Sequence, residues 1–222
     1  MRSGGRAASA AHVPTWTRRS AACAAGPRTG VSSWHSVADV EQPRERVVGR
    51  VEQIWVYPVR SLAGTAVPAA EVTGHGLAGD RAWTVLGDDD RVVRAKDAPA
   101  MADVPATGDP RADAGALTAV LGRAVRLVPT PEGGTGVAPV HLVSRGAIER
   151  AAAGEVPDGC SADTPRANLV LTLDGDERTW VGRELRVGEA LLEVTRTPKH
   201  CLGVYADVRQ AGRISVGDLV SL

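Results

Sequence analysis

Short β-branched and aromatic segments, separated by turns rich in Gly, Pro and Asp, follow one another along this chain from residue 48 to its end. The first of them, residues 48–57, is partly alternating and stops at Pro58, which has no N–H to donate to a neighbouring strand. Many short strands at close spacing are typical of barrels and sandwiches. We therefore expect a β-rich α+β fold with a barrel- or sandwich-like body and few short helices.

The remaining elements are predicted from the same local patterns. Two segments are predicted to be helical: residues 113–121, with Asp113 as an acidic cap, and residues 144–153, with Ser144 as the cap. Further strands are predicted at residues 69–73, 82–86, 92–95, 125–128, 169–173, 184–187, 190–196, 203–208 and 214–222.

The chain divides by composition into a leader and two candidate domains. Residues 1–47 are rich in Ala, Ser, Gly and Arg and lack apolar periodicity, so we expect a disordered or spurious extension with an inert Cys23. Its composition also resembles an organelle transit peptide, whereas its apolar centre is too weak for a secretory signal. The Gly- and Pro-rich loop 130–138 separates an expected domain at residues 48–130 from another at residues 138–222. We expect a cytoplasmic protein.

Composition excludes several classes of protein. Of the 222 residues, 43% are apolar, yet no run approaches the roughly 18 apolar residues that a membrane helix needs. The 26 basic and 26 acidic residues balance, which argues against a general nucleic-acid binder. Residues 51–222 alone carry 18 basic and 23 acidic residues, so several cations gathered in one pocket would stand out there as a local anion site.

Common catalytic and metal-binding motifs are absent. There is no Walker loop, dinucleotide-binding fingerprint, zinc-protease motif or nucleophile elbow. The three cysteines, Cys23, Cys160 and Cys201, contain no C-x-x-C pair, and we interpret the Asp-rich turn at residues 88–90 as a solvated hairpin tip. The five histidines lack metal-ligand spacing and are expected to be surface or hydrogen-bonded structural residues: His12, His35, His75, His141 and His200.

Longer stretches carry a resemblance to a known family. Residues 51–64, with the sequence VEQIWVYPVRSLAG, are similar to the opening of the N-terminal β-barrel domain of MOSC-domain proteins, in which a strand ends in Tyr-Pro-Val-Lys/Arg-Ser followed by Gly. Residues 76–83, GLAGDRAW, resemble the family's Gly-Leu and Asp-Arg-x-Trp motif. Residues 94–99, RAKDAP, resemble its short basic segment before a proline.

The second half resembles the MOSC domain itself, in the same order. Residues 140–144, VHLVS, are similar to its opening strand and serine, and residues 166–170, RANLV, to its Arg-Pro-Asn motif with Ala in place of Pro. Residues 180–188, WVGRELRVG, match its Trp-x-Gly-x-x-Leu-x-x-Gly stretch. Residues 203–208, GVYADV, and 212–218, GRISVGD, resemble its closing hairpin.

The resemblance, which covers residues 48–222, implies a site for the molybdenum cofactor, molybdopterin. In members such as the amidoxime-reducing component, one cysteine thiolate binds the molybdenum, and basic and hydroxyl side chains hold the pterin phosphate. Carried over, the resemblance implies that Cys201 is the metal ligand and catalytic centre. The implied cofactor-binding residues are Arg60, Ser61, Arg81, Lys96, Ser144, Arg166 and Asn168.

These residue types suit such a site on chemical grounds. A thiolate is a soft ligand that suits a heavy metal, and an arginine fork matches the oxygens of a phosphate. The residues taken alone also allow a structural interpretation, in which Cys201 is a buried thiol and Arg60 and Arg81 are solvated surface charges. Trp83 and Trp180 are expected in the core.

The implied function is a molybdenum-dependent oxidoreductase that reduces small N-hydroxylated compounds. No cluster of cysteines is present to hold iron–sulfur, so we expect electrons from a separate ferredoxin- or flavin-type reductase, and neither a nucleic-acid nor a membrane partner. Cys201 runs directly into residues 202–205, where cofactor-binding members have a longer connection. Two alternatives stay open: a non-catalytic molybdenum-cofactor or sulfur-carrier binding module, and a member that folds but binds no cofactor.

Overall fold

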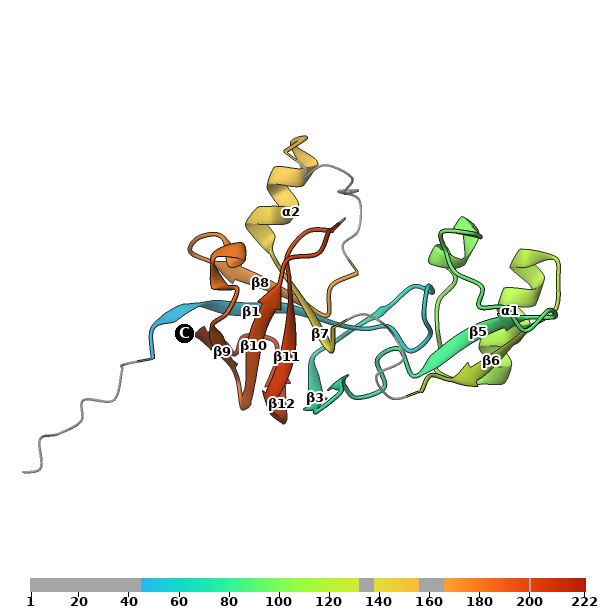
Figure 1. Ribbon diagram of the computed structural model, residues 1–222, viewed down its shortest axis with the longest axis horizontal. Coiled ribbons are helices and arrows are strands. Elements are labelled where there is room, and N and C mark those ends of the chain that lie inside the picture. Colours follow the sequence, from blue (N-terminus) through green and yellow to red (C-terminus); the bar gives the residue numbers. More distant parts are fainter. Residues whose placement is uncertain (1–44, 132–137, 156–165, 200) are drawn as a thin grey trace, which may run out of the picture. The chain divides into compact units, whose positions relative to one another are not determined.

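The computed structural model describes residues 45–131, 138–155, 166–199 and 201–222, and these residues form many short strands and two α-helices (Figure 1). The strands are β1 (Val47–Val56), β2 (Thr65–Val67), β3 (Ala69–Thr73), β4 (Gly76–Leu77), β5 (Trp83–Gly87), β6 (Val125–Pro129), β7 (Val140–Ser144), β8 (Leu169–Leu173), β9 (Glu184–Val187), β10 (Ala190–Arg196), β11 (Val204–Gln210), β12 (Gly212–Ser215) and β13 (Leu219–Ser221). The helices are α1 (Pro110–Leu121) and α2 (Arg145–Ala152), with 3-10 turns η1 (Pro99–Asp103) and η2 (Glu177–Trp180). The expected β-rich fold with few helices is confirmed.

Seven strands close into a barrel in the order β13-β9-β10-β11-β7-β8-β1, because β13 also pairs with β1. All neighbours are antiparallel except β7 and β8, which are parallel, and β2 adds to β1 outside the ring. The expected barrel is therefore confirmed. Strands from both expected domains build it, since β1 lies between β8 and β13; the domain boundaries themselves stay a prediction.

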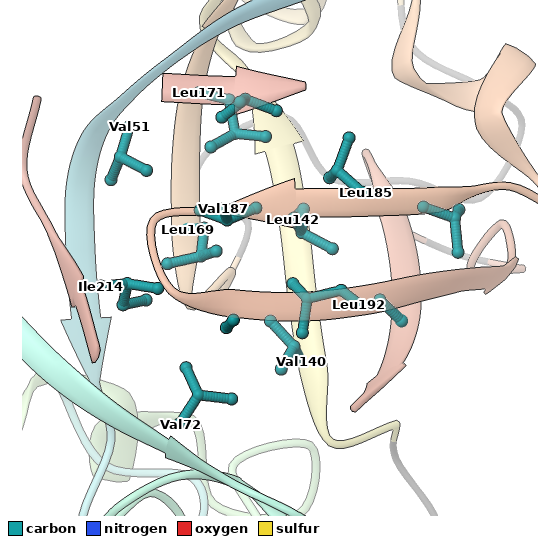
Figure 2. Close-up of a cluster of buried hydrophobic side chains, with 14 of the residues drawn as sticks. Val51, Val72, Val140, Leu142, Leu169, Leu171, Leu185, Val187, Leu192 and Ile214 are labelled. Carbon is teal, nitrogen blue, oxygen red and sulfur yellow. The ribbon is translucent and has the colours of Figure 1, made fainter. Parts of the chain in front are cut away.

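The barrel interior is filled by Val and Leu side chains from several strands (Figure 2). On β1 the buried residues are Val48, Val51 and Ile54, a spacing of three rather than two. The register of β1 shifts before Gly49 and after Val51, so bulges reset which side chain faces the interior. A Cβ at Gly49 would lie 2.1 Å from the carbonyl oxygen of Thr172, which explains a glycine at this close approach of β1 to β8.

A second hydrophobic cluster involves β5, α1 and η1, and its buried residues include Val59, Leu62, Val85, Met101 and Leu117. No helix in the described ranges is long and apolar enough to cross a membrane.

The start of α1 corrects the predicted cap. The carboxylate of Asp109 accepts hydrogen bonds from the backbone N–H groups of Arg111 (2.8 Å) and Ala112 (3.0 Å), and Pro110 is the first helical residue. Asp113 lies within the first turn instead. It is buried and accepts from the N–H and hydroxyl of Thr107. The prediction was wrong because any acid near a helix start resembles a cap until the turn before it is known.

Of the other local predictions, one helix cap and one core residue are confirmed, and two strands need correction. Ser144 caps α2 as predicted, accepting from the N–H of Ala147 at 3.0 Å, and Trp180 is buried as expected. The predicted strand 92–95 is wrong: only Val92 forms an isolated bridge, because a turn follows it. The predicted strand 214–222 is divided into β12 and β13 by a turn at Gly217.

Several predictions lie outside the described residues. They concern residues 1–44 with Cys23, His12 and His35, most of the loop 130–138, and Cys160 and His200.

Candidate functional site

A cavity of about 240 Å³ lies where the segment after β1, the turn before β5 and the strands β7 and β11 come together. We call it the anion cavity. It is lined by Arg60, Ser61, Arg81, Ala95, His141, Arg166, Cys201 and Tyr205. The fold thus brings together five residues that the sequence analysis expected at one site, from positions as far apart in the chain as Arg60 and Cys201.

Backbone hydrogen bonds position the first part of this lining. The N–H of Arg81 donates to the carbonyl of Tyr57 at 2.7 Å, and the N–H of Arg60 donates to the carbonyl of Trp83 at 2.9 Å. The Tyr57 N–H in turn donates to the carboxylate of Asp80 at 2.8 Å. These bonds tie the segment after β1 to the turn before β5, so two stretches with separate motifs present their side chains to one cavity.

Asn168 holds the Arg81 side chain from behind the cavity wall. Arg81 is paired with Asp80, and its guanidinium also donates to the Asn168 side-chain oxygen at 3.3 Å. That oxygen accepts a further bond from the N–H of His141 (3.1 Å), and the Asn168 amide donates to the carbonyl of Trp55 (3.3 Å). Because Asn168 is fully buried and bonded on both sides, the structure places it behind Arg81 and outside the lining.

Arg166 is packed against the ring of Tyr57. Its guanidinium carbon lies 4.4 Å from the ring centroid, and that of Arg81 lies 5.7 Å from the same centroid. The Tyr57 hydroxyl donates to the carbonyl of Ala167 at 3.3 Å, and a Cβ at Gly64 would lie 2.5 Å from the ring. The ring is therefore held firmly and supports Arg166, which lines the anion cavity.

The cavity is electropositive. Burial lowers the pKa of the Arg60 guanidinium, and the positive charges of Arg94 and Arg81 lower it further. Burial is also the main reason that the pKa of Arg166 is lowered, with the charge of Arg81 acting in the same direction. Arg60 and Arg166 are thus each partly buried near the guanidinium of Arg81, which is itself paired with Asp80. A bound anion would relieve this repulsion, so the arrangement suits a phosphate group.

Cys201 reaches the cavity from a constrained turn before β11 and is half-buried. The buried His141 side chain donates through Nε2 to the carbonyl of Leu202 at 2.7 Å, and burial lowers the pKa of this histidine. Gly203 has a φ of +83°, and a Cβ there would lie 2.0 Å from the carbonyl oxygen of Leu142. His141 and Gly203 together fix the backbone directly after Cys201.

Two further expected cofactor-binding residues, like Asn168, lie outside the lining of the anion cavity. Lys96 is exposed and follows Ala95, which does line the anion cavity. Ser144 is buried, and its hydroxyl accepts the capping bond of α2. A direct role for either residue in cofactor binding stays a prediction.

His141 and Tyr205 line the cavity but were not expected there as site residues. They are cross-strand partners in β7 and β11, and their rings meet edge to face with centroids 4.9 Å apart. His141 lies in VHLVS and Tyr205 in GVYADV, two stretches that resemble the MOSC domain, and this resemblance could have pointed to both residues. The expectation of a hydrogen-bonded structural histidine agrees with the bond of His141 to Leu202. Among the described residues, no group of three or more His, Cys, Asp or Glu side chains could hold a metal ion.

Comparisons with known proteins agree with the resemblance found in the first half of the chain. Residues 48–128 match the family described as MOSC N-terminal beta barrel domain. The chain is 33% identical over 89 residues to mitochondrial amidoxime-reducing component 1 of Mus musculus, and 33% identical over 90 residues to mitochondrial amidoxime reducing component 2 of Homo sapiens. The resemblance to the MOSC N-terminal beta barrel domain found in the sequence is therefore confirmed for residues 48–128.

These matches are partial. They cover 38% and 39% of this chain and 26% and 27% of the two relatives, so the chain spans about a quarter of the length of the curated relatives it matches. Among solved structures, the YuaD protein from Bacillus subtilis is similar with a TM-score of 0.47 and 12% sequence identity, covering 80% of this chain and 97% of that one.

Proposed function

We propose that this protein binds the molybdenum cofactor in the anion cavity and uses it to reduce small N-hydroxylated compounds. The observation that carries the proposal is the convergence of three arginines, Ser61 and Cys201 on the same cavity. The distant likeness to amidoxime-reducing components supports the choice of cofactor and reaction class.

The donor set of the cavity fits the two ends of such a cofactor. Arg60, Arg81 and Arg166 would hold its phosphate, since arginine forks bind phosphate oxygens in pairs. Ser61 adds a neutral hydrogen bond from its hydroxyl group. Cys201 lies on the same lining and would hold the molybdenum as a thiolate, the kind of soft ligand that a heavy metal prefers.

Reduction of an N–OH group consumes two electrons and two protons: the N–O bond breaks, an N–H bond forms and the oxygen leaves as water. The bound cofactor would supply the electron pair, which a separate ferredoxin- or flavin-type reductase must replace. The protein's own residues position the reaction. The anion cavity fixes the phosphate end, and the bond from His141 to Leu202 holds the turn that carries Cys201.

The first test is the metal and pterin content of protein purified from a host that makes the cofactor. We expect near-stoichiometric molybdenum in the wild type, and Cys201→Ala should remove most of it. Arg166→Gln should weaken cofactor retention by roughly 10- to 100-fold, because a charged hydrogen bond contributes about 1.5–3 kcal/mol. Arg111→Gln, at an exposed position on α1, is the matched control. Folded wild-type protein without molybdenum would contradict the proposal.

A second candidate is a module that carries the cofactor or sulfur without catalysing a reaction. The direct run from Cys201 into β11 favours it, because only Leu202 and Gly203 separate them. Turnover of benzamidoxime with chemically reduced viologen distinguishes the two. Benzamidine formation that depends on Cys201 supports the reductase, whereas bound cofactor without turnover supports the carrier.

A further inference from the structure

Glu177 carries a buried carboxyl group and does not line the anion cavity. It opens η2 and is only 1% exposed. Its Oε1 atom accepts a hydrogen bond from the backbone N–H of Ser144 at 3.1 Å. Its Oε2 atom is buried and, within the described part of the chain, has no hydrogen-bond partner. A buried oxygen left unpaired is unfavourable, so this position needs an explanation.

Glu177 lines a second cavity of about 320 Å³, which we call the Glu177 cavity. Cys201 lines this cavity as well as the anion cavity, so the two meet at that side chain. Ala147, Pro198 and Leu202 supply apolar wall. The volume falls within the range of small-molecule pockets, which combine apolar walls with a few polar groups that orient the ligand.

Within the described residues, no charged side chain around this cavity forms a hydrogen bond with Oε2 of Glu177. Arg178 also lines the cavity, but its guanidinium is bonded to Asp176, with Nε 3.0 Å from both carboxylate oxygens and Nη2 2.6 Å from one of them. Arg150 and Glu155, the other charged residues of the lining, are exposed and of opposite sign. Among the described residues that line this cavity, the carboxyl group of Glu177 therefore holds a buried side-chain oxygen with unmet bonding capacity.

We propose that the Glu177 cavity binds small organic cations with N–H donors, of the amidinium type, and that Glu177 is the acceptor that selects them. An amidinium presents two N–H groups in one plane, which matches a carboxylate, while its apolar substituent lies against Ala147 and Leu202. The role of this ligand as substrate or product beside Cys201 rests on the proposed function. The binding itself needs no metal.

The test is to measure the affinity of benzamidine for metal-free protein by calorimetry. Glu177→Gln should weaken binding at least 10-fold, because the side chain keeps an oxygen for the Ser144 N–H but turns a donor toward the ligand. Glu149→Gln is the matched control, an exposed residue of α2 outside this lining, and should change affinity less than twofold. Benzamide, the neutral analogue, should bind at least 10-fold more weakly than benzamidine.

Equal benzamidine affinity in wild type and Glu177→Gln, or a loss of binding confined to Glu155→Gln, would overturn the inference. Should Glu177→Gln fail to fold, wild-type amide spectra decide: benzamidine must shift the Ser144 and Ala147 N–H signals, and unchanged signals refute the site. Glu177-dependent binding in a protein that never acquires molybdenum would keep this inference and remove the proposed function. Molybdenum-loaded protein that does not bind benzamidine would keep the proposed function and remove this inference.

Discussion

Ser61 and Arg81 both line the anion cavity with positive φ angles, 75° and 51°. Such backbone conformations cost on the order of 1–3 kcal/mol each for non-glycine residues and persist where the surroundings enforce them. Here the backbone bond from Arg81 to Tyr57 supplies part of that enforcement. Both side chains were expected at the site through a family resemblance, but no local pattern indicates their backbone conformation, because distant hydrogen bonds impose it.

Gly203 offers a test of how tightly the Cys201 turn is held. Gly203→Ala should destabilise the protein by about 3 kcal/mol or more, because the left-handed conformation and a collision with the Leu142 carbonyl both oppose a Cβ. Gly182→Ala should lose only about 1 kcal/mol, since Gly182 has a similar φ of +85° but open space around it. Urea unfolding measures both. Equal losses would show that the close approach to β7 is unimportant.

At the scale of elements, residue type and spacing located most strands and both helices. Strands were missed or wrongly predicted where pairing with residues far along the chain decides whether a strand forms. β2 and β4 are too short to show a pattern, and the strand expected at residues 92–95 found only one bridging contact. An ion pair that joins the start of α2 to β1 is likewise a link that no local pattern reveals: the Arg145 Nε donates to both Glu52 carboxylate oxygens, at 3.0 and 3.1 Å.

This link between β1 and α2 predicts a pH dependence. The hydrogen bond from Arg145 holds the pKa of Glu52 below its ordinary value of 4.5. The stabilisation is therefore fully present above about pH 4.5 and is lost as pH falls through the lowered pKa of the folded state. Glu52→Gln should cost about 0.5–1 kcal/mol at pH 7, the range of a partly exposed ion pair.

Thermal unfolding from pH 7 to pH 3 should show the difference between wild type and Glu52→Gln shrinking toward zero. Glu71→Gln is the control, because Glu71 and Arg213 form a pair in which both side chains are 58% exposed. That variant should be nearly neutral throughout. A Glu52→Gln deficit that stays constant down to pH 3 would contradict the assigned cause.

For the whole molecule, barrel closure depends on β1. This strand fills the gap between β8 and β13 and buries Val48, Val51 and Ile54. The region matched as a MOSC N-terminal beta barrel domain therefore contributes a strand to a ring that also contains strands from the second half of the chain.

A fragment of residues 138–222, the second expected domain, should not fold cooperatively. Without β1 it leaves two barrel edges open and loses the burial of three apolar side chains, on the order of 6 kcal/mol, comparable with the total stability of a domain. Near-ultraviolet circular dichroism and thermal scans should show no native signal, whereas residues 45–222 should unfold in one transition. A native, cooperative fragment would show that the ring closes without β1.

The sequence by itself determined the β-rich class and most of the elements, because strand patterns are local properties. Five residues that line the anion cavity were expected at one site only through motifs shared with a known family. Only the tertiary structure decided that β1 closes a barrel with the second half, that Tyr205 faces His141, and that Asn168 lies behind Arg81. It also decided that Glu177 is buried beside Cys201, with one oxygen that has no hydrogen-bond partner among the residues the structure describes. The physical reason is the same in each case: pairing across strands and burial are set by residues far apart in the chain, whose proximity follows from barrel closure rather than from local sequence.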